Sequence, residues 1–156
     1  MSAKRVQLGK AGITLLALCV GLGAERDARA TLGGDMASVA ANEQTLRAVR
    51  TISVLSVGER HDLALPSGVV IREYLASGGA VYAVTWSGPR VPNLQELLGP
   101  HFADLAKRAP QGGHNRMSLT GDDFEVRSAG HRHYFAGRAW IPSLVPTGVN
   151  LDTVLE

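Results

Sequence analysis

Residues 69–86 read VVIREYLASGGAVYAVTW and carry the clearest structural pattern in the chain. Two runs rich in β-branched and aromatic residues flank the glycine-rich segment 76–79, and this pattern predicts a β-hairpin. We expect Tyr82, Val84 and Trp86 to share one face of the second strand, because alternate side chains of a strand point the same way.

Further β segments lie on both sides of this hairpin. Before it, residues 51–57 alternate roughly between apolar and polar, and residues 61–65 form a second short strand pattern after a break at 58–60. After it, strands are expected at 117–120, at 124–128 and, beyond a break at 129–130, from 131 to 141. These segments together predict a sheet of about five to seven strands.

Two helical segments complete the pattern. Asp35 can cap a helix over residues 36–48, where apolar residues recur at loose helical spacing. Asn93 can cap a second helix, which Gly99-Pro100 should kink or restart because proline has no backbone N–H. Residues 31–156 are therefore expected to form a single α+β domain, with a twisted antiparallel sheet, an N-terminal helix and a kinked helix between two β blocks.

The first thirty residues differ in kind from the rest of the chain. A basic start precedes an uncharged run over residues 11–24, which is short for a membrane span. The sequence Ala28-Arg29-Ala30 then has the small side chains that signal peptidase requires. We expect residues 1–30 to be a cleavable Sec-type signal peptide, cut between Ala30 and Thr31. The domain would then be periplasmic or secreted, with no stable membrane anchor; an uncleaved anchor is the alternative.

Cleavage at this position changes the chemistry of the mature chain. It removes Cys19, the only cysteine, so no disulfide and no thiolate metal ligand is available. It also leaves eleven Lys and Arg against twelve Asp and Glu, without a basic block. Nucleic-acid binding is therefore not expected.

Several motifs of the mature chain resemble one known family. Together they are similar to the proteobacterial family of small exported proteins catalogued as domain of unknown function 2844, over essentially the whole mature chain. That family has no assigned activity, so the resemblance implies no functional residue. The motifs are ATLG at 30–33, VIREY at 70–74, YAVTWSGP at 82–89, PNLQELLG at 92–99, GDD at 121–123, GH at 130–131 and FAGRAWIP at 135–142.

His131 and His133 are candidate metal ligands. Two imidazoles at alternate positions of a strand point to one face and can share a metal ion, with His114 or Asp122 as a third ligand. A solvent-facing or hydrogen-bonded pair is the interpretation we favour, because no second-shell partner can be identified. A small metal-binding protein or metal-dependent enzyme that uses these histidines is therefore the alternative function.

Charged residues in the expected strands indicate a solvated face of the sheet. We expect them to form a cross-strand ladder there, where a ligand carboxylate can also dock. Since no nucleophile or cofactor loop is recognisable, the leading hypothesis is an exported cell-envelope protein, a non-enzymatic binding or assembly module without a cofactor. Its sheet or sheet edge would contact another exported protein or a polymer; the oligomeric state is not indicated. The ladder residues are Arg72, Glu73, Arg127, Arg132 and Arg138.

Overall fold

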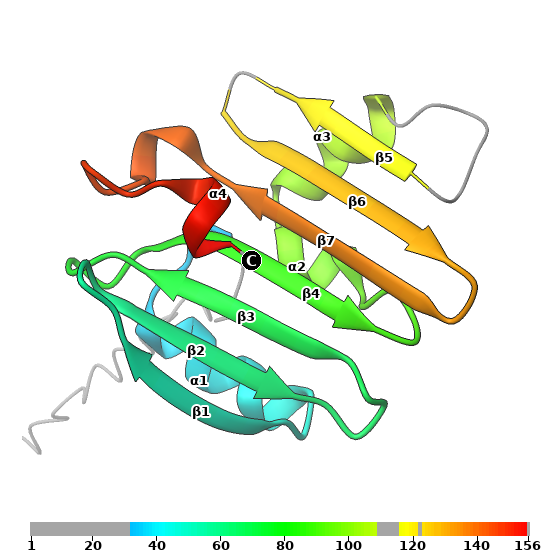
Figure 1. Cartoon of the computed structure of the whole chain (residues 1–156), viewed down its shortest axis with the longest axis horizontal. Helices are drawn as coiled ribbons and strands as arrows, with labels where there is room; N and C mark the ends of the chain where they lie inside the picture. The colour runs from blue at the N-terminus through cyan, green and yellow to red at the C-terminus, as the bar shows by residue number, and fades with distance from the viewer. Residues whose placement is uncertain (1–31, 109–115, 122, 156) are drawn as a thin grey trace, which may run out of the picture.

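The computed structural model describes residues 32–108, 116–121 and 123–155 (Figure 1). In this part of the chain, seven strands form one antiparallel sheet, which confirms the α+β class. The strands are β1 (Val49–Val54), β2 (Glu59–Ala64), β3 (Val70–Leu75), β4 (Val81–Gly88), β5 (Arg116–Thr120), β6 (Glu125–His131) and β7 (Tyr134–Trp140). Their order across the sheet is β1-β2-β3-β4-β7-β6-β5.

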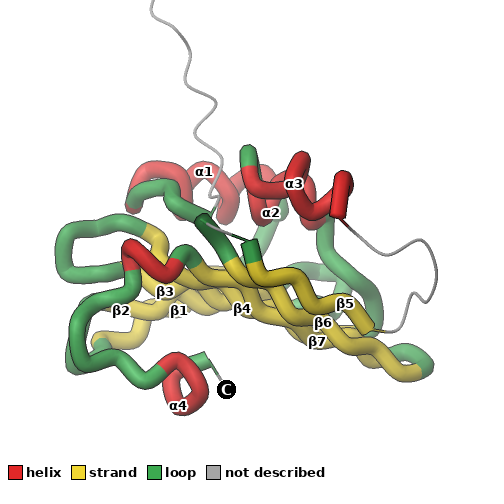
Figure 2. Tube along the Cα trace, turned by 90° about the horizontal axis from the view of Figure 1, so that it is seen from above, coloured by secondary structure: helices red, strands yellow, loops and turns green. Residues whose placement is uncertain are grey.

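Three helices cover one side of this sheet. They are α1 (Met36–Thr45), α2 (Leu94–Leu98) and α3 (His101–Arg108), and Figure 2 shows them in one layer above the strands. On the other side, Figure 2 shows helix α4 (Leu151–Val154), which follows the 3-10 turn Pro142–Leu144 along the chain. We refer to the first side as the helical face and to the second as the open face.

The hairpin of residues 69–86 forms β3 and β4 at the centre of the sheet. The register between these strands shifts at Tyr74 and Leu75, which marks a β-bulge. Tyr82 therefore packs with Tyr74 on the open face, whereas Val84 and Trp86 pack in the main core under the helices. The expectation that Tyr82 shares a face with Val84 and Trp86 is wrong, because a bulge interrupts the alternation of side chains.

The main core lies between the helical face and the helices. Val39 of α1, Leu97 of α2 and Leu105 of α3 pack against it and are buried. At its centre Trp86 lies against Gly137, where an added Cβ would come within 2.2 Å of the indole ring. Glycine is therefore required at position 137 for β4 and β7 to pair with this tryptophan in place.

Local capping chemistry fixes the ends of the helices. Asp35 caps α1 by accepting a hydrogen bond from the Ser38 backbone N–H at 2.9 Å, and Asn93 caps α2. The chain restarts as α3 after Gly99 and Pro100, as the sequence predicts. Helix α1 ends at Thr45, before the expected residue 48, because the chain turns at Arg47, whose φ of 50° is incompatible with a helix.

The strand ends differ from the sequence expectation in two places. Residues 129–130 are not a break: they continue β6, and the chain turns instead at Arg132 and His133. Both turn residues have positive φ, 38° and 27°, as a two-residue hairpin turn requires, although Asn and Gly are the usual residues there. The expected break at 58–60 lies earlier in the chain: β1 ends at Val54 and β2 begins at Glu59, so the turn takes residues 55–58.

Among the described residues, none of the helices has both the length and the apolar character needed to cross a bilayer. The expected signal peptide and its cleavage site at Ala30 and Thr31 lie outside the described residues. Both stay predictions.

Candidate functional site

The two candidate metal ligands of the last hairpin do not lie on one strand. His131 is the last residue of β6, and His133 lies in the turn that follows. The strand alternation that would place both imidazoles on one face therefore does not apply. His114 and Asp122 lie outside the described residues, and within the described ones no group of three or more His, Cys, Asp or Glu side chains is arranged to hold a metal ion. Metal binding that involves His114 or Asp122 stays a prediction.

Arginines form a row across the open face. Arg127 of β6 pairs in register with Arg138 of β7, which pairs with Thr85 of β4, which pairs with Arg72 of β3. Neighbouring strands are about 4.8 Å apart, so this line spans roughly 14 Å from β6 to β3. Two more arginines lie one row away on the same face, in β2 and β5. We refer to the whole set as the arginine row: Arg60, Arg72, Arg116, Arg127 and Arg138.

One end of the arginine row lines a shallow groove of about 450 Å³ over β5, β6 and β7. Its positive charge comes from Arg116, Arg127 and Arg138. Its lining also contains the small side chains of Ala129 and Ala136, which leave space above the strands. Hydroxyl groups and Leu155 of the C-terminal segment complete the lining. The groove therefore offers several hydrogen-bond donors and positive charge on an open surface.

Trp140 positions the two central arginines. The guanidinium carbons of Arg127 and Arg138 lie 5.3 and 5.7 Å from the centroid of its ring, within the range of cation–π attraction. Arg138 also forms an ion pair of 3.0 Å with Asp152, and Arg127 one of 3.5 Å with Glu125. The side chains of Asp152 and Arg127 are 84% and 52% exposed, so both ion pairs are hydrated and weak.

The other end of the arginine row is partly neutralised. Asp62 Oδ1 lies 2.9 Å from Arg60 Nε and 3.7 Å from Arg72 Nε, so a single carboxylate serves two arginines. Beneath them, burial raises the pKa of the Tyr74 hydroxyl, which stays protonated. Since five arginines meet three paired carboxylates on this face, the row keeps a positive excess.

Two members of the expected charge ladder do not belong to it. Glu73 points to the helical face and is completely buried, because Ile71 and Leu75 on either side of it face the core. Arg132 lies in the turn between β6 and β7. The assignment of both residues to the solvated face is wrong, whereas Arg72, Arg127 and Arg138 do lie on the open face.

Glu73 has an unusual environment under α1. The side chain of Asn42, which is buried, donates a hydrogen bond from Nδ2 to Glu73 Oε1 at 3.3 Å. Burial raises the pKa of Glu73 from 4.5 to about 7, against the lowering effects of the Asn42 hydrogen bond and the charge of Arg50. The carboxyl group therefore titrates near neutral pH.

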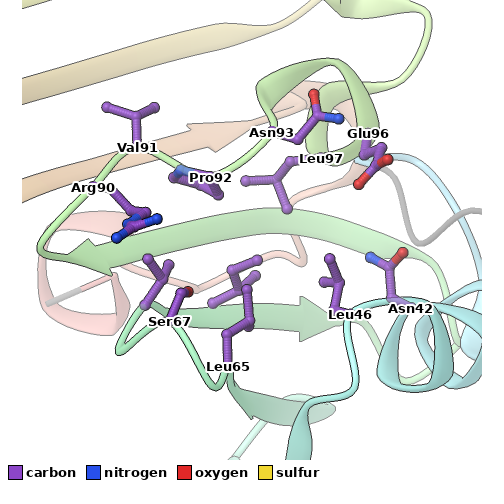
Figure 3. Close-up of a pocket in the computed structure, with 12 residues that line it drawn as sticks. Asn42, Leu46, Leu65, Ser67, Arg90, Val91, Pro92, Asn93, Glu96 and Leu97 are labelled. Carbon is purple, nitrogen blue, oxygen red and sulfur yellow. The ribbon is translucent and has the colours of Figure 1, made fainter.

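A second cavity, of about 200 Å³, lies on the helical face between α1, α2 and the segment 90–93. Figure 3 shows Arg90 and Ser67 at one end and Asn42 and Glu96 at the other. No local sequence pattern predicts this cavity, because its walls come from segments far apart along the chain. The apolar side chains between its two ends include Leu46, Leu65 and Leu97.

A sequence profile of the family described as "Protein of unknown function (DUF2844)" matches residues 28–154. The chain belongs to the DUF2844 family. The match confirms the resemblance found in the motifs, and within the described residues it covers the whole sheet and all the helices. No curated protein and no solved structure matches the chain.

Proposed function

We propose that this DUF2844 protein is an exported cell-envelope protein, a non-enzymatic binding module that holds an acidic polymer on its open face. The proposal rests mainly on Arg127 and Arg138, which stand directly opposite each other in neighbouring strands on the face away from the three helices. Like charges in this arrangement destabilise a sheet. A ligand with negative charges between the two guanidinium groups removes that repulsion.

The shape of the arginine row favours a polymer over a small anion. Each of five strands contributes one arginine, so the positive charge is spread across the sheet and does not converge on one point. The line from Arg127 to Arg72 extends over roughly 14 Å, which is longer than a single carboxylate can contact. Ser118 adds a hydroxyl group along the same line. A chain with repeated carboxylates and hydroxyls matches this surface.

Export is supported by the sequence at the N-terminus. Residues 1–30 have the basic start, the short apolar run and the small residues at the cleavage position that are typical of a secretory signal. In the cell envelope, an exported domain meets acidic polysaccharides directly. This compartment therefore agrees with the ligand chemistry that the open face favours.

Titration with polygalacturonate, a linear polymer with one carboxylate per sugar, tests the proposed function. Untagged protein purified from its native host is titrated at low salt, and tryptophan fluorescence is recorded. The signal includes Trp140, which is 6% exposed and contacts both arginines, whereas Trp86 lies in the main core on the helical face. Neutral dextran serves as the control polymer.

Arg127→Gln and Arg138→Gln are each expected to raise the Kd for polygalacturonate roughly tenfold, because a charge-assisted hydrogen bond contributes about 1.5–3 kcal/mol. Arg108→Gln is the matched control, since Arg108 ends α3 on the other side of the sheet. Its Kd should stay unchanged. Equal losses in all three variants, or no binding by the unaltered protein, would contradict the proposed function.

A further inference from the structure

The cavity between α1 and α2 is separate from the open face, because it lies on the opposite side of the sheet. Its volume is about 200 Å³. A buried cavity of about 150 Å³ in another protein holds a benzene molecule, so this space suits a body the size of one ring or of a short branched chain. The open mouth leaves room for polar groups at both ends.

The two ends of the cavity carry opposite charges. Arg90 stands at one end and Glu96 at the other (Figure 3). Within the described residues, neither side chain is within 4.0 Å of an opposite charge. The two charges lie at opposite ends of the cavity and form no ion pair with each other. A ligand can supply both counter-ions.

Apolar side chains fill the space between the charges. Leu46 at the end of α1, Leu65 of the loop before β3 and Leu97 of α2 line the middle of the cavity, and Val69 and Ile71 also belong to its lining. They provide contacts for a hydrocarbon body, and burying such a body is favourable by about 25 cal/mol per Å². The lining is therefore charged at two ends and hydrophobic between them.

Asn42 supplies the neutral polar group at the Glu96 end of the cavity. Its side chain is buried, and its hydrogen bond to Glu73 Oε1 holds the carboxamide against the wall of the cavity. Ser67 places a hydroxyl group at the Arg90 end. Each end thus combines a charge with a neutral polar group, which is a common composition for a small-molecule site.

We propose that this cavity binds a small zwitterion whose ammonium and carboxylate groups lie at opposite ends of an apolar body, the class to which short apolar peptides belong. The carboxylate pairs with Arg90 and Ser67. The ammonium group pairs with Glu96 near Asn42. The apolar body packs on Leu46, Leu65 and Leu97.

The test uses the dipeptide alanyl-valine as the probe, with full-length protein from its native host, and isothermal titration calorimetry. Two blocked forms accompany it: the N-acetylated peptide, which has no ammonium group, and the C-amidated peptide, which has no carboxylate. The free dipeptide should bind at least tenfold more tightly than either blocked form. Circular dichroism checks that each protein variant is folded.

Arg90→Gln should weaken the free dipeptide about tenfold without weakening the amidated form further. Glu96→Gln should weaken the free dipeptide similarly without a further loss for the N-acetylated form. Arg108→Gln is the control and should change nothing. Three results would overturn the proposal. The free and blocked peptides could bind equally, affinity could depend on only one of the two charged ends of the peptide, or millimolar peptide could give no heat of binding. Unchanged polygalacturonate binding by Arg90→Gln separates this site from the open face.

Discussion

Glu73 of β3 lies directly opposite His61 of β2, and both side chains are completely buried. Each has one partner: Asn42 donates to Glu73 Oε1, and His61 Nε2 lies 3.1 Å from Glu59 Oε2. Glu73 Oε2 and His61 Nδ1 have no hydrogen-bond partner in the described part of the chain. Since a buried polar atom without a partner costs free energy, the stability of the domain depends on the protonation of Glu73.

The free energy of unfolding should fall as the pH rises from about 4.5 to 7. Glu73 has a pKa of about 7 in the folded protein, against 4.5 ordinarily, so the folded state binds more protons in this interval. Stability that is present at low pH is therefore lost as Glu73 ionises. At 1.36 kcal/mol per pKa unit, the contribution of this group is about 3 kcal/mol. Urea denaturation at pH 5 and at pH 8 measures the change.

Glu73→Gln isolates the effect of this residue from other titrating groups. Glutamine has the shape of the protonated acid and can still accept the hydrogen bond from Asn42. The variant should match the unaltered protein at pH 5 and exceed it at pH 8 by about 3 kcal/mol. The same pH dependence in both proteins would mean that Glu73 is ionised normally in the folded state.

Gly137→Ala should destabilise the domain by about 1–3 kcal/mol, because overpacking a core has this cost. Its Cβ would lie 2.2 Å from Trp86 Cζ2. Gly78→Ala is the matched control in the turn between β3 and β4, where an added Cβ meets no atom within 4 Å. Its effect should stay within about 0.5 kcal/mol. Thermal unfolding of both variants measures the two changes in stability. Equal losses of stability would show that Trp86 does not require glycine at position 137.

Asp152→Asn should strengthen polygalacturonate binding roughly two- to fivefold, because Asp152 competes with the polymer for Arg138 through an exposed ion pair that contributes little to folding. Stability should be nearly unchanged. The fluorescence titration on Trp140 measures the affinity, with Asp104→Asn in α3 as the control. Weaker binding by Asp152→Asn would contradict the docking of the polymer on Arg138.

The mature protein should begin at Thr31. Intact-mass spectrometry of protein isolated from its native host, together with cell fractionation, tests the predicted signal peptide of residues 1–30. A chain that retains Met1, or that fractionates with the cytosol, would remove the basis for export.

Local chemistry explains the parts of the fold that the sequence could predict. The caps at Asp35 and Asn93, the restart after Gly99 and Pro100, and the hairpin of 69–86 each depend on residues near one another along the chain. The turn at Arg132 and His133 could not be found in this way. Its residues rarely adopt positive φ, and the pairing of β6 with β7 imposes that conformation.

The candidate sites, too, include features that the sequence could predict and features that it could not. The sequence predicts Arg72, Arg127 and Arg138 on the solvated face because charged residues in the strands of a half-buried sheet are usually exposed. The sequence does not predict that Glu73 is buried, because a charged side chain is usually exposed to solvent. The pairing of β3 in the sheet places this side chain in the core. The cavity between α1 and α2 depends on the packing of three separate segments, for which no local pattern exists.

The central claim is that the arginine row contacts an acidic polymer, and NMR spectroscopy of arginine side chains tests it most directly. The Nε–Hε signals are followed while polygalacturonate is added to labelled protein. If the polymer binds there, the signals of Arg72, Arg127 and Arg138 shift and saturate together, while those of Arg90 and Arg108 stay in place. Signals that do not move, or shifts confined to Arg90 and Arg108, would contradict it.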